Sequence, residues 1–404
     1  MQRAGFYLIG LLVLASTFFP QGSSNRYWIA ESFFIATLIL GIALLAISIS
    51  YDKKITLNKI DLVVIFLLLY MIICNPLISV IKGSSIENIL LISLPFLLIG
   101  SYFLFKHFIS SIKEYHLISN LFVVCAITIC IGVYYSYLNI GIGLSSFSRP
   151  TGIEGVMTFT LPILPIACVM TFSRVLTSLT KRKLFINLIL FVFIFIAILL
   201  TETRGLFLSS LSGILLFLIF FVFQAPKGQQ LKAYFLVGFL FINIVAFTIL
   251  FGIGLLERFV DEGDREIVTI LGRLDEFNAF YNGFQENKIF GKGLGSVFEG
   301  YSEFDLSLNL DGLTTCHSHL FFILGTTGIV GAILYYVPIF LSIYILLIKP
   351  NSKINKLFNS ELQIVACAFS AGFIFTLSST TFNSVVYNLF LGFLLYSANL
   401  KLLK

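Results

Sequence analysis

The feature that most constrains this chain is a series of apolar runs, each long enough to cross a bilayer as a helix. A transmembrane helix needs about 20 apolar residues, and in lipid only a helix or a closed barrel satisfies every backbone polar group. The sequence therefore predicts an all-α membrane protein with about 12 transmembrane helices. The predicted spans lie near residues 5–20, 27–49, 61–82, 89–105, 117–138, 152–172, 184–200, 205–224, 233–255, 328–348, 361–380 and 381–399.

Composition excludes several other classes of protein. Hydrophobic residues make up 58% of the chain and charged residues only 11%, whereas a soluble domain carries about a quarter charged residues. Five of the six cysteines lie inside apolar runs, and no CxxC or Cys/His spacing is present, so neither a disulfide framework nor a metal site is predicted. The first run ends without a small-x-small cleavage site, so we expect it to be retained as a span.

The distribution of basic residues predicts the orientation. With a cytoplasmic N-terminus, seventeen of the 26 lysines and arginines fall on the cytoplasmic side, and the short loops alternate without a violation. Both termini are then cytoplasmic. The net charge of +6 follows from this pattern and does not indicate nucleic-acid binding, because no basic and aromatic patch interrupts the spans.

One long loop divides the chain into three parts. Residues 1–255 carry the first nine predicted spans, residues 256–318 form the loop on the outer side, and residues 319–404 carry the last three spans. The loop holds twelve of the twenty acidic residues, first in an amphipathic helical pattern and then in a stretch rich in glycine and aromatic residues. A loop of this length is usually functional or disordered, and its aromatic residues favour a folded cap against the membrane.

The loop ends in two of the four histidines, within DGLTTCHSHLFFILGTTGIVG. His317 and His319 stand where the polar loop meets an apolar run, and an imidazole at that position can transfer protons near neutral pH. His317 is therefore a candidate general base, with His319 in support. The alternative is a histidine that only holds a loop by hydrogen bonds.

Three arginines on the outer side are candidates for binding an anion. Arg204 stands in TETRG between two apolar runs, where a charged side chain is expensive unless it faces a cavity or a partner. Its alternative is a snorkelling arginine paired with Glu202. Arg149 lies in a short outer loop and Arg273 in the loop helix; a plain loop arginine and a solvated salt bridge are their alternatives. Guanidinium forks suit a diphosphate, because they donate in pairs and stay charged.

Two further patterns in the loop have structural interpretations. The run GKGLG at 291–295 follows no strand and is not followed by GK[ST], so we expect a tight turn rather than a nucleotide loop. The acidic pairs Asp261/Asp264 and Asp275/Glu276 fall on one charged helix and are expected to form a solvated face, rather than to bind a metal or cleave a glycoside.

Together these features resemble the bacterial O-antigen ligase and O-antigen polymerase superfamily of polytopic glycosyltransferases. The T-[ES]-[ST]-R-G form matches 201–205, and an outer arginine precedes an aromatic helix and a Gly-x-Gly-x-Gly turn. Four residues meet the signature His-[Asn/Ser/Gln]-x9-Gly-x-x-[Gly/Thr/Tyr]. The twelve-span layout, with its largest loop between spans nine and ten, also resembles that of the superfamily. The chain departs from many relatives at Thr326-Thr327, where they carry an acidic residue. The four residues are His317, Ser318, Gly328 and Gly331.

The resemblance implies metal-independent, inverting glycosyl transfer at the periplasmic face of the bacterial inner membrane, in a GT-C-type enzyme without a cofactor. The donor would be a glycan on undecaprenyl diphosphate. In this picture three residues are catalytic: His317 as the base, with Arg204 and Arg273 stabilising the leaving diphosphate. The residues expected to bind substrate are Arg149, His319, Ser318, Gly328 and Gly331.

The signature favours an O-antigen ligase, whose acceptor is lipid A-core in lipopolysaccharide biosynthesis. The alternative is an O-antigen polymerase, which joins lipid-linked repeat units. A more distant alternative is a transporter of lipid-linked glycans, although no internal repeat of the kind common in transporters is visible. No nucleic-acid partner is expected.

Overall fold

A computed structural model describes residues 2–16, 28–52, 57–140, 161–201, 203–224, 238, 263–299, 313–349, 356–377 and 384–403. Within these ranges every regular element is a helix, and one isolated bridge joins Phe298 and Leu313. The predicted all-α class is thus confirmed for the part of the chain that the structure describes.

Seven helical stretches of the described chain are long and apolar enough to cross a membrane. Three shorter apolar helices accompany them, at Gln2–Ser16 in α1, Ile35–Ser48 in α2 and Ile163–Thr177, which is α8. The predicted span at 233–255 lies outside the described residues except for Gly238, so the count of twelve stays a prediction. The seven stretches are Lys59–Ile81, Ile86–Phe108, Ile112–Tyr135, Lys181–Leu200, Gly205–Phe223, His319–Leu347 and Val385–Leu403.

The elements follow one another as α1 Gln2–Ser16, α2 Trp28–Asp52, α3 Lys59–Leu69, a π-helical turn Tyr70–Cys74, α4 Asn75–Ile81, α5 Ile86–Leu97, a 3-10 turn Leu98–Gly100, α6 Ser101–Phe108, α7 Ile112–Ile140, α8 Ile163–Thr177, α9 Lys181–Leu200, α10 Arg204–Gln224, α12 Gly263–Glu286, α13 His319–Leu347, α14 Lys356–Thr376 and α15 Val385–Leu403.

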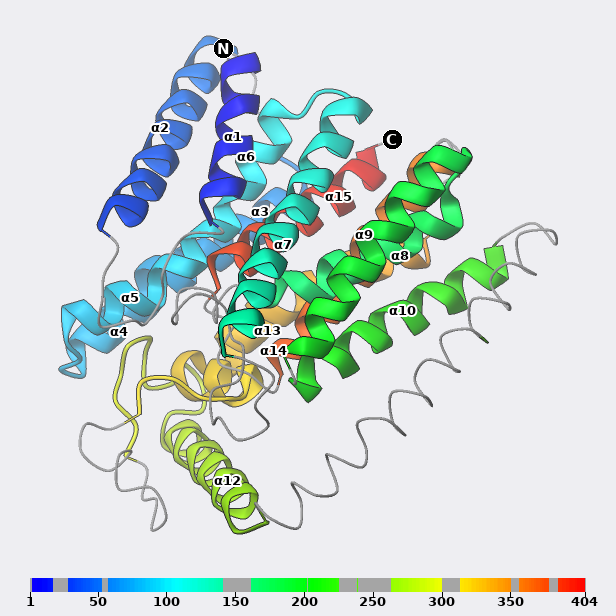
Figure 1. The fold of residues 1–404 in the computed structure, drawn as a ribbon. Helices are drawn as coiled ribbons and strands as arrows, with labels where there is room; N and C mark the ends of the chain where they lie inside the picture. Colours follow the sequence, from blue (N-terminus) through cyan, green and yellow to red (C-terminus); the bar gives the residue numbers. More distant parts are fainter. Residues whose placement is uncertain are drawn as a thin grey trace.

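The helices form a bundle, and α12 lies below its lower end as drawn in Figure 1. Both termini lie at the upper end. The helices α8 and α15 are buried along nearly their whole described length, and α14 packs against α8 and α10. By contrast, only 22% of the candidate span in α9 is buried, so most of that helix is free to face lipid.

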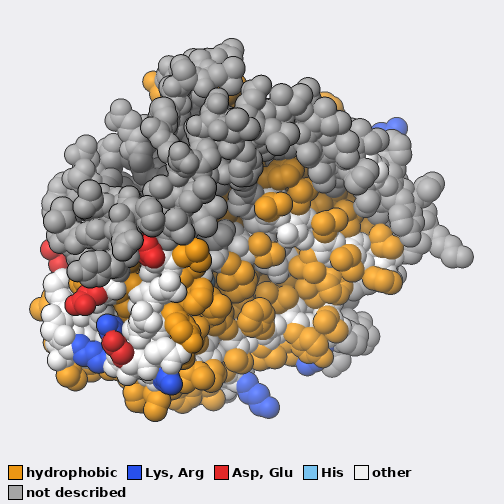
Figure 2. Space-filling model, turned by 90° about the horizontal axis from the view of Figure 1, so that it is seen from below, with side chains coloured by type: hydrophobic (Ala, Val, Ile, Leu, Met, Phe, Trp, Pro, Cys, Tyr) orange, Lys and Arg blue, Asp and Glu red, His pale blue; other side chains and the backbone are white. Residues whose placement is uncertain are grey.

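Figure 2 views the molecule from the end that carries α12. Hydrophobic side chains cover much of the described surface in this view, while acidic and basic side chains gather toward one edge. The exposed apolar residues are large ones, such as Phe66, Phe185 and Phe223. Large contiguous apolar patches are rare on soluble monomers, so this surface fits a chain embedded in lipid.

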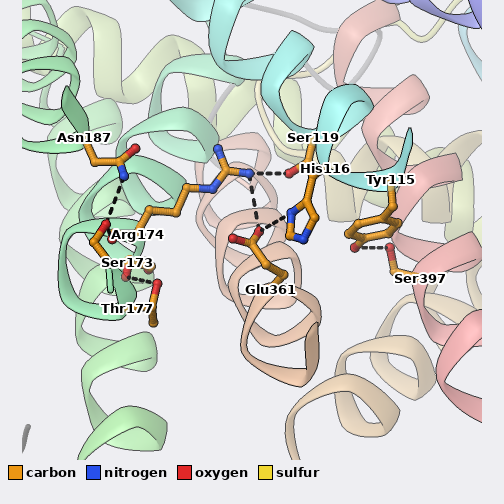
Figure 3. A network of polar contacts seen from close by, with 10 residues as sticks. Tyr115, His116, Ser119, Ser173, Arg174, Thr177, Asn187, Glu361 and Ser397 are labelled. Carbon is orange, nitrogen blue, oxygen red and sulfur yellow. Dashed lines mark hydrogen bonds and ion pairs between the residues drawn. The ribbon is translucent and has the colours of Figure 1, made fainter. Parts of the chain in front are cut away.

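A polar cluster joins α7, α8 and α14 inside the bundle (Figure 3). The guanidinium of Arg174 donates to Ser119 Oγ at 2.7 Å and pairs with Glu361 at 3.4 Å. The ring of His116 lies 3.8 Å from the same carboxylate. The cluster satisfies charges that would otherwise be costly between packed helices.

The helix α13 is kinked at Gly328, where the backbone takes φ +65° and ψ −167°. The predicted span at 328–348 therefore begins at the kink, and a helical segment from His319 to Thr327 precedes it. The helix begins at His319, the residue with which the third predicted part of the chain begins. The kink breaks the direction of α13 after the segment His319–Thr327.

Candidate active site

The centre of the candidate site is the contact between His317 and Glu276. The Glu276 carboxylate accepts a hydrogen bond from the backbone N–H of His317 at 3.0 Å, and its Oε2 lies 2.8 Å from Nδ1 of the imidazole. The Glu276 side chain is 8% exposed, whereas the His317 side chain is 40% exposed. A buried carboxylate thus holds an imidazole that solvent or a substrate can reach.

Aromatic packing between α12 and α13 brings these two residues together. The ring of Phe277 stacks on that of Phe321 with centroids 5.1 Å apart, and Phe280 packs against Phe322 at 5.9 Å. Phe280 also stacks on Phe298 at 3.9 Å. Such pairs bury large apolar areas with a preferred geometry, so they fix the rotation of α12 that turns Glu276 inward.

The prediction that the acidic residues of the loop helix form a solvated face is wrong at Glu276. Its neighbour Asp275 is half-buried and Leu274 is exposed, but Glu276 is buried and bonded to His317. The sequence placed Arg273 one turn away, with a solvated salt bridge as the alternative to its role in binding an anion. The physical reason for the difference is a partner 41 residues further along the chain, which no helical spacing could reveal.

Cys316 precedes the histidine and is fully buried. Burial, together with the nearby Glu276 charge, raises the pKa of Cys316 to about 12. The thiol therefore stays protonated at neutral pH and is a poor nucleophile. Ser318 is buried and occupies the N-cap position of α13 without a side-chain cap, and its backbone N–H donates to the Cys316 sulfur at 3.4 Å.

The glycine run 291–295 forms the predicted tight turn. Gly291, Gly293 and Gly295 all have positive φ, between +71° and +106°. The turn docks onto the kink of α13, because Lys292 N–H donates to the carbonyl of Gly325 at 2.8 Å and Gly293 N–H to that of Thr326 at 2.7 Å. These bonds satisfy carbonyls that the kinked helix leaves without helical partners.

Residues near the start of the chain clamp the same turn. The Asn75 side chain accepts from Leu294 N–H at 2.6 Å and donates to the Thr326 carbonyl at 3.1 Å. The Tyr70 hydroxyl donates to the Thr327 carbonyl at 2.6 Å. The two clamp residues belong to the π-helical turn and to the first position of α4, just before Pro76, which has no backbone N–H. This contribution of the first 150 residues was not predicted from the sequence, where its only local signal is the Asn-Pro pair inside an apolar run.

Of the three predicted arginines, Arg273 is the one whose side chain the structure describes. Arg273 is exposed on α12, one turn before Glu276. The helix α10 begins at Arg204, at the end of the bundle below which α12 lies (Figure 1); its side chain is outside the described residues. Arg149 lies outside the described residues altogether. Roles for all three in binding diphosphate stay predictions.

His319 is enclosed, unlike its neighbour His317. It is fully buried, with the rings of Tyr335, Tyr336 and Phe373 at 4.9, 5.7 and 6.3 Å between centroids. The packing of these rings around His319 holds the start of α13 in place. Its predicted contact with substrate stays a prediction.

The two signature glycines have packing roles. A side chain at Gly328 would overlap the backbone of Ile289, and one at Gly331 would overlap Thr327 and Tyr70. They let the segment before the glycine turn and the π-helical turn Tyr70–Cys74 approach α13 closely. Whether Gly328, Gly331 and Ser318 also contact substrate stays a prediction.

No group of three or more His, Cys, Asp or Glu side chains that could hold a metal ion occurs among the residues the structure describes. Metal independence stays a prediction, which chelation can test.

Comparison with known proteins found a family model that matches part of the chain. Residues 189–336 match the family model described as O-antigen ligase. The matched segment contains Arg204, Arg273, Glu276, the glycine turn and His317, but not Arg149. A search of curated proteins found no match. This match covers part of the chain, and it supports the resemblance to the O-antigen ligase and polymerase superfamily.

Proposed function

We propose that this protein is an O-antigen ligase, which transfers a glycan from undecaprenyl diphosphate to a sugar hydroxyl of lipid A-core. The observation that carries the proposal is the Glu276–His317 pair, which lies within the family-matched segment and joins α12 to the residue that precedes the N-cap of α13. The match to the O-antigen ligase family supports transfer of this general kind, by a ligase or a polymerase.

His317 serves as the general base. Since a carboxylate only accepts hydrogen bonds, Nδ1 of His317 donates to Glu276, and the neutral imidazole presents Nε2 as its acceptor. The acceptor hydroxyl attacks the anomeric carbon, and its proton passes to Nε2. The bond from that carbon to the diphosphate oxygen breaks with inversion, and the electron pair leaves with the lipid diphosphate. Glu276 stabilises the imidazolium that forms.

Fixed positive charge assists departure of the diphosphate. Arg273 stands one turn from Glu276 on α12, and Arg204 begins α10 at the same end of the bundle. Guanidinium groups can donate paired hydrogen bonds to phosphate oxygens without changing protonation state. We assign this role to Arg204 and Arg273, with Arg149 as a third binding group, and the reaction then requires no metal ion.

The site faces the periplasm in this proposal. Two observations support it. Both termini lie at the end of the bundle opposite to α12, and the distribution of lysines and arginines favours cytoplasmic termini. The polyprenyl tail of the donor would lie against the exposed apolar surface of the helices.

A polymerase is the second candidate, because the same dyad could activate a hydroxyl of another lipid-linked repeat unit. Analysis of lipopolysaccharide from a deletion strain on gels separates the two. Free core together with retained lipid-linked long chains indicates a ligase, whereas core with a single repeat indicates a polymerase. Unchanged lipopolysaccharide would contradict both.

A further inference from the structure

A polar pocket lies just past the C-terminal end of α12, whereas Glu276 lies near the middle of that helix. It has a volume of about 330 Å³ and is formed between the α4–α5 turn and the glycine turn. Its lining includes two lysines and two serines, and no acidic residue. These four residues are Lys82, Lys292, Ser84 and Ser296.

The Lys82 ammonium is held in place rather than free in solvent. It donates to the Asn287 side chain at 2.6 Å and to the Gly291 carbonyl at 2.9 Å, so one of its three N–H bonds is left for a ligand. Ser84 and Ser296 hydroxyls lie 3.0 Å apart and join the two walls. The pocket is therefore built from fixed hydrogen-bonding groups.

Lys292 contributes the second charge. Its ammonium lies 5.4 Å from the centre of the Phe298 ring and 3.2 Å from the carboxylate of Glu286, whose side chain is 63% exposed. An exposed ion pair of this kind is weak, so Lys292 can exchange it for a better acceptor. Burial and the nearby Lys292 charge lower the pKa of Lys82, and an anion between the two ammonium groups would relieve that repulsion.

Apolar residues adjoin both lysines in the chain. Ile81, the last residue of a candidate membrane span, is 84% exposed, and Ile86 is 68% exposed on the far side of the turn. Ile289 and Phe290 are exposed just before Lys292. Fixed cations beside exposed apolar side chains at the end of a span suit a ligand that has an anionic head and a hydrocarbon tail.

We infer that this pocket binds the phosphate group of a lipid, with Lys82 and Lys292 on the phosphate oxygens and the lipid chain against Ile81 and Phe290. The inference does not depend on the catalytic role of His317. Two sources carry this chemistry: an isoprenoid diphosphate, as in the proposed donor, and an acidic phospholipid of the surrounding bilayer.

The test measures binding to the full-length protein in a neutral detergent by microscale thermophoresis, with the dye on a C-terminal tag. The probes are farnesyl diphosphate, a short-chain phosphatidic acid, inorganic pyrophosphate, and the uncharged lipids farnesol and diacylglycerol. We expect the two phosphorylated lipids to bind, and K82Q/K292Q to weaken them about tenfold or more, since charge-assisted hydrogen bonds are among the strong ones. The relative affinities of farnesyl diphosphate and phosphatidic acid identify the source.

The matched control is K288Q, which removes an exposed lysine of the same segment that does not line the pocket; its affinity should stay within about twofold. K82R keeps the charge and should retain binding. Where the double variant fails to fold, K292Q alone decides, because it leaves the Lys82 bonds to the turn intact.

Three results would overturn the inference: unchanged binding in K82Q/K292Q and K292Q, equal loss in K288Q, or pyrophosphate binding as tightly as farnesyl diphosphate. H317A should bind the phosphorylated lipids normally. A failure of the catalytic proposal would therefore leave this result unaffected, and the two are distinguishable.

Discussion

The Glu276 carboxylate contacts His317 twice, through the backbone N–H at 3.0 Å and through Nδ1 at 2.8 Å. The first bond fixes where the histidine backbone enters α13, and the second fixes the rotation and tautomer of its ring. Glu276 is thus a positioning residue for His317.

Glu276→Gln is expected to lower the rate of glycan transfer on the order of a hundredfold or more, while KM changes little. The amide has one oxygen for two donors and no charge to stabilise an imidazolium; loss of the carboxylate in a hydrolase triad costs about 10⁴. The measurement is kcat and its pH profile with purified protein and lipid-linked donor. D275N, the same change at the preceding residue, should keep its activity, and an active E276Q with a normal pH profile would refute the positioning role.

His317→Ala is expected to abolish transfer with normal expression in the membrane. The reason is that the side chain is 40% exposed, so its removal leaves no large cavity, but the attacking hydroxyl loses its base. Lipopolysaccharide gels of a complemented deletion strain, with immunoblots of the membrane fraction, check both points. A strain that makes substantial amounts of ligated product with this variant would exclude His317 as the base.

Arg204→Lys is expected to impair transfer nearly as much as Arg204→Ala. Lysine keeps the charge but loses the planar pair of donors that suits a diphosphate. The rates of the two variants are compared in the same assay, with R182K, at an exposed arginine in the first turn of α9, as the control. Full activity of the lysine variant would count against paired hydrogen bonds to the diphosphate.

Gly291→Ala is expected to destabilise the protein by about 2 kcal/mol or more, because a residue with a Cβ is disfavoured at φ +71° and the added methyl group would overlap the Thr326 backbone. The melting temperature in detergent should fall and transfer should be lost with it. The control is G272A on α12, where an added Cβ meets no atom within 4 Å. A Gly291→Ala variant as stable as the control would mean that the turn is not clamped on α13.

Transfer is expected to survive EDTA, because the proposed mechanism stabilises the leaving diphosphate with arginines instead of a cation. The assay uses purified protein in detergent, so that chelation cannot act through the outer membrane. Loss of activity that Mg²⁺ or Mn²⁺ restores would show that a metal ion takes part.

The sequence by itself determined the membrane class, the position of most helices and the polar stretch that contains His317. These follow from local patterns: apolar runs of span length and the glycine turn at 291–295 are set by neighbouring residues. The tertiary structure alone decided that Glu276 is buried against His317, and that Asn75 clamps Leu294 from 219 residues away. An acidic residue on a charged helix has the same sequence pattern whether it faces water or a histidine. Only the packing of α12 on α13 distinguishes the two, because it supplies the hydrogen-bond donors that make a buried carboxylate stable.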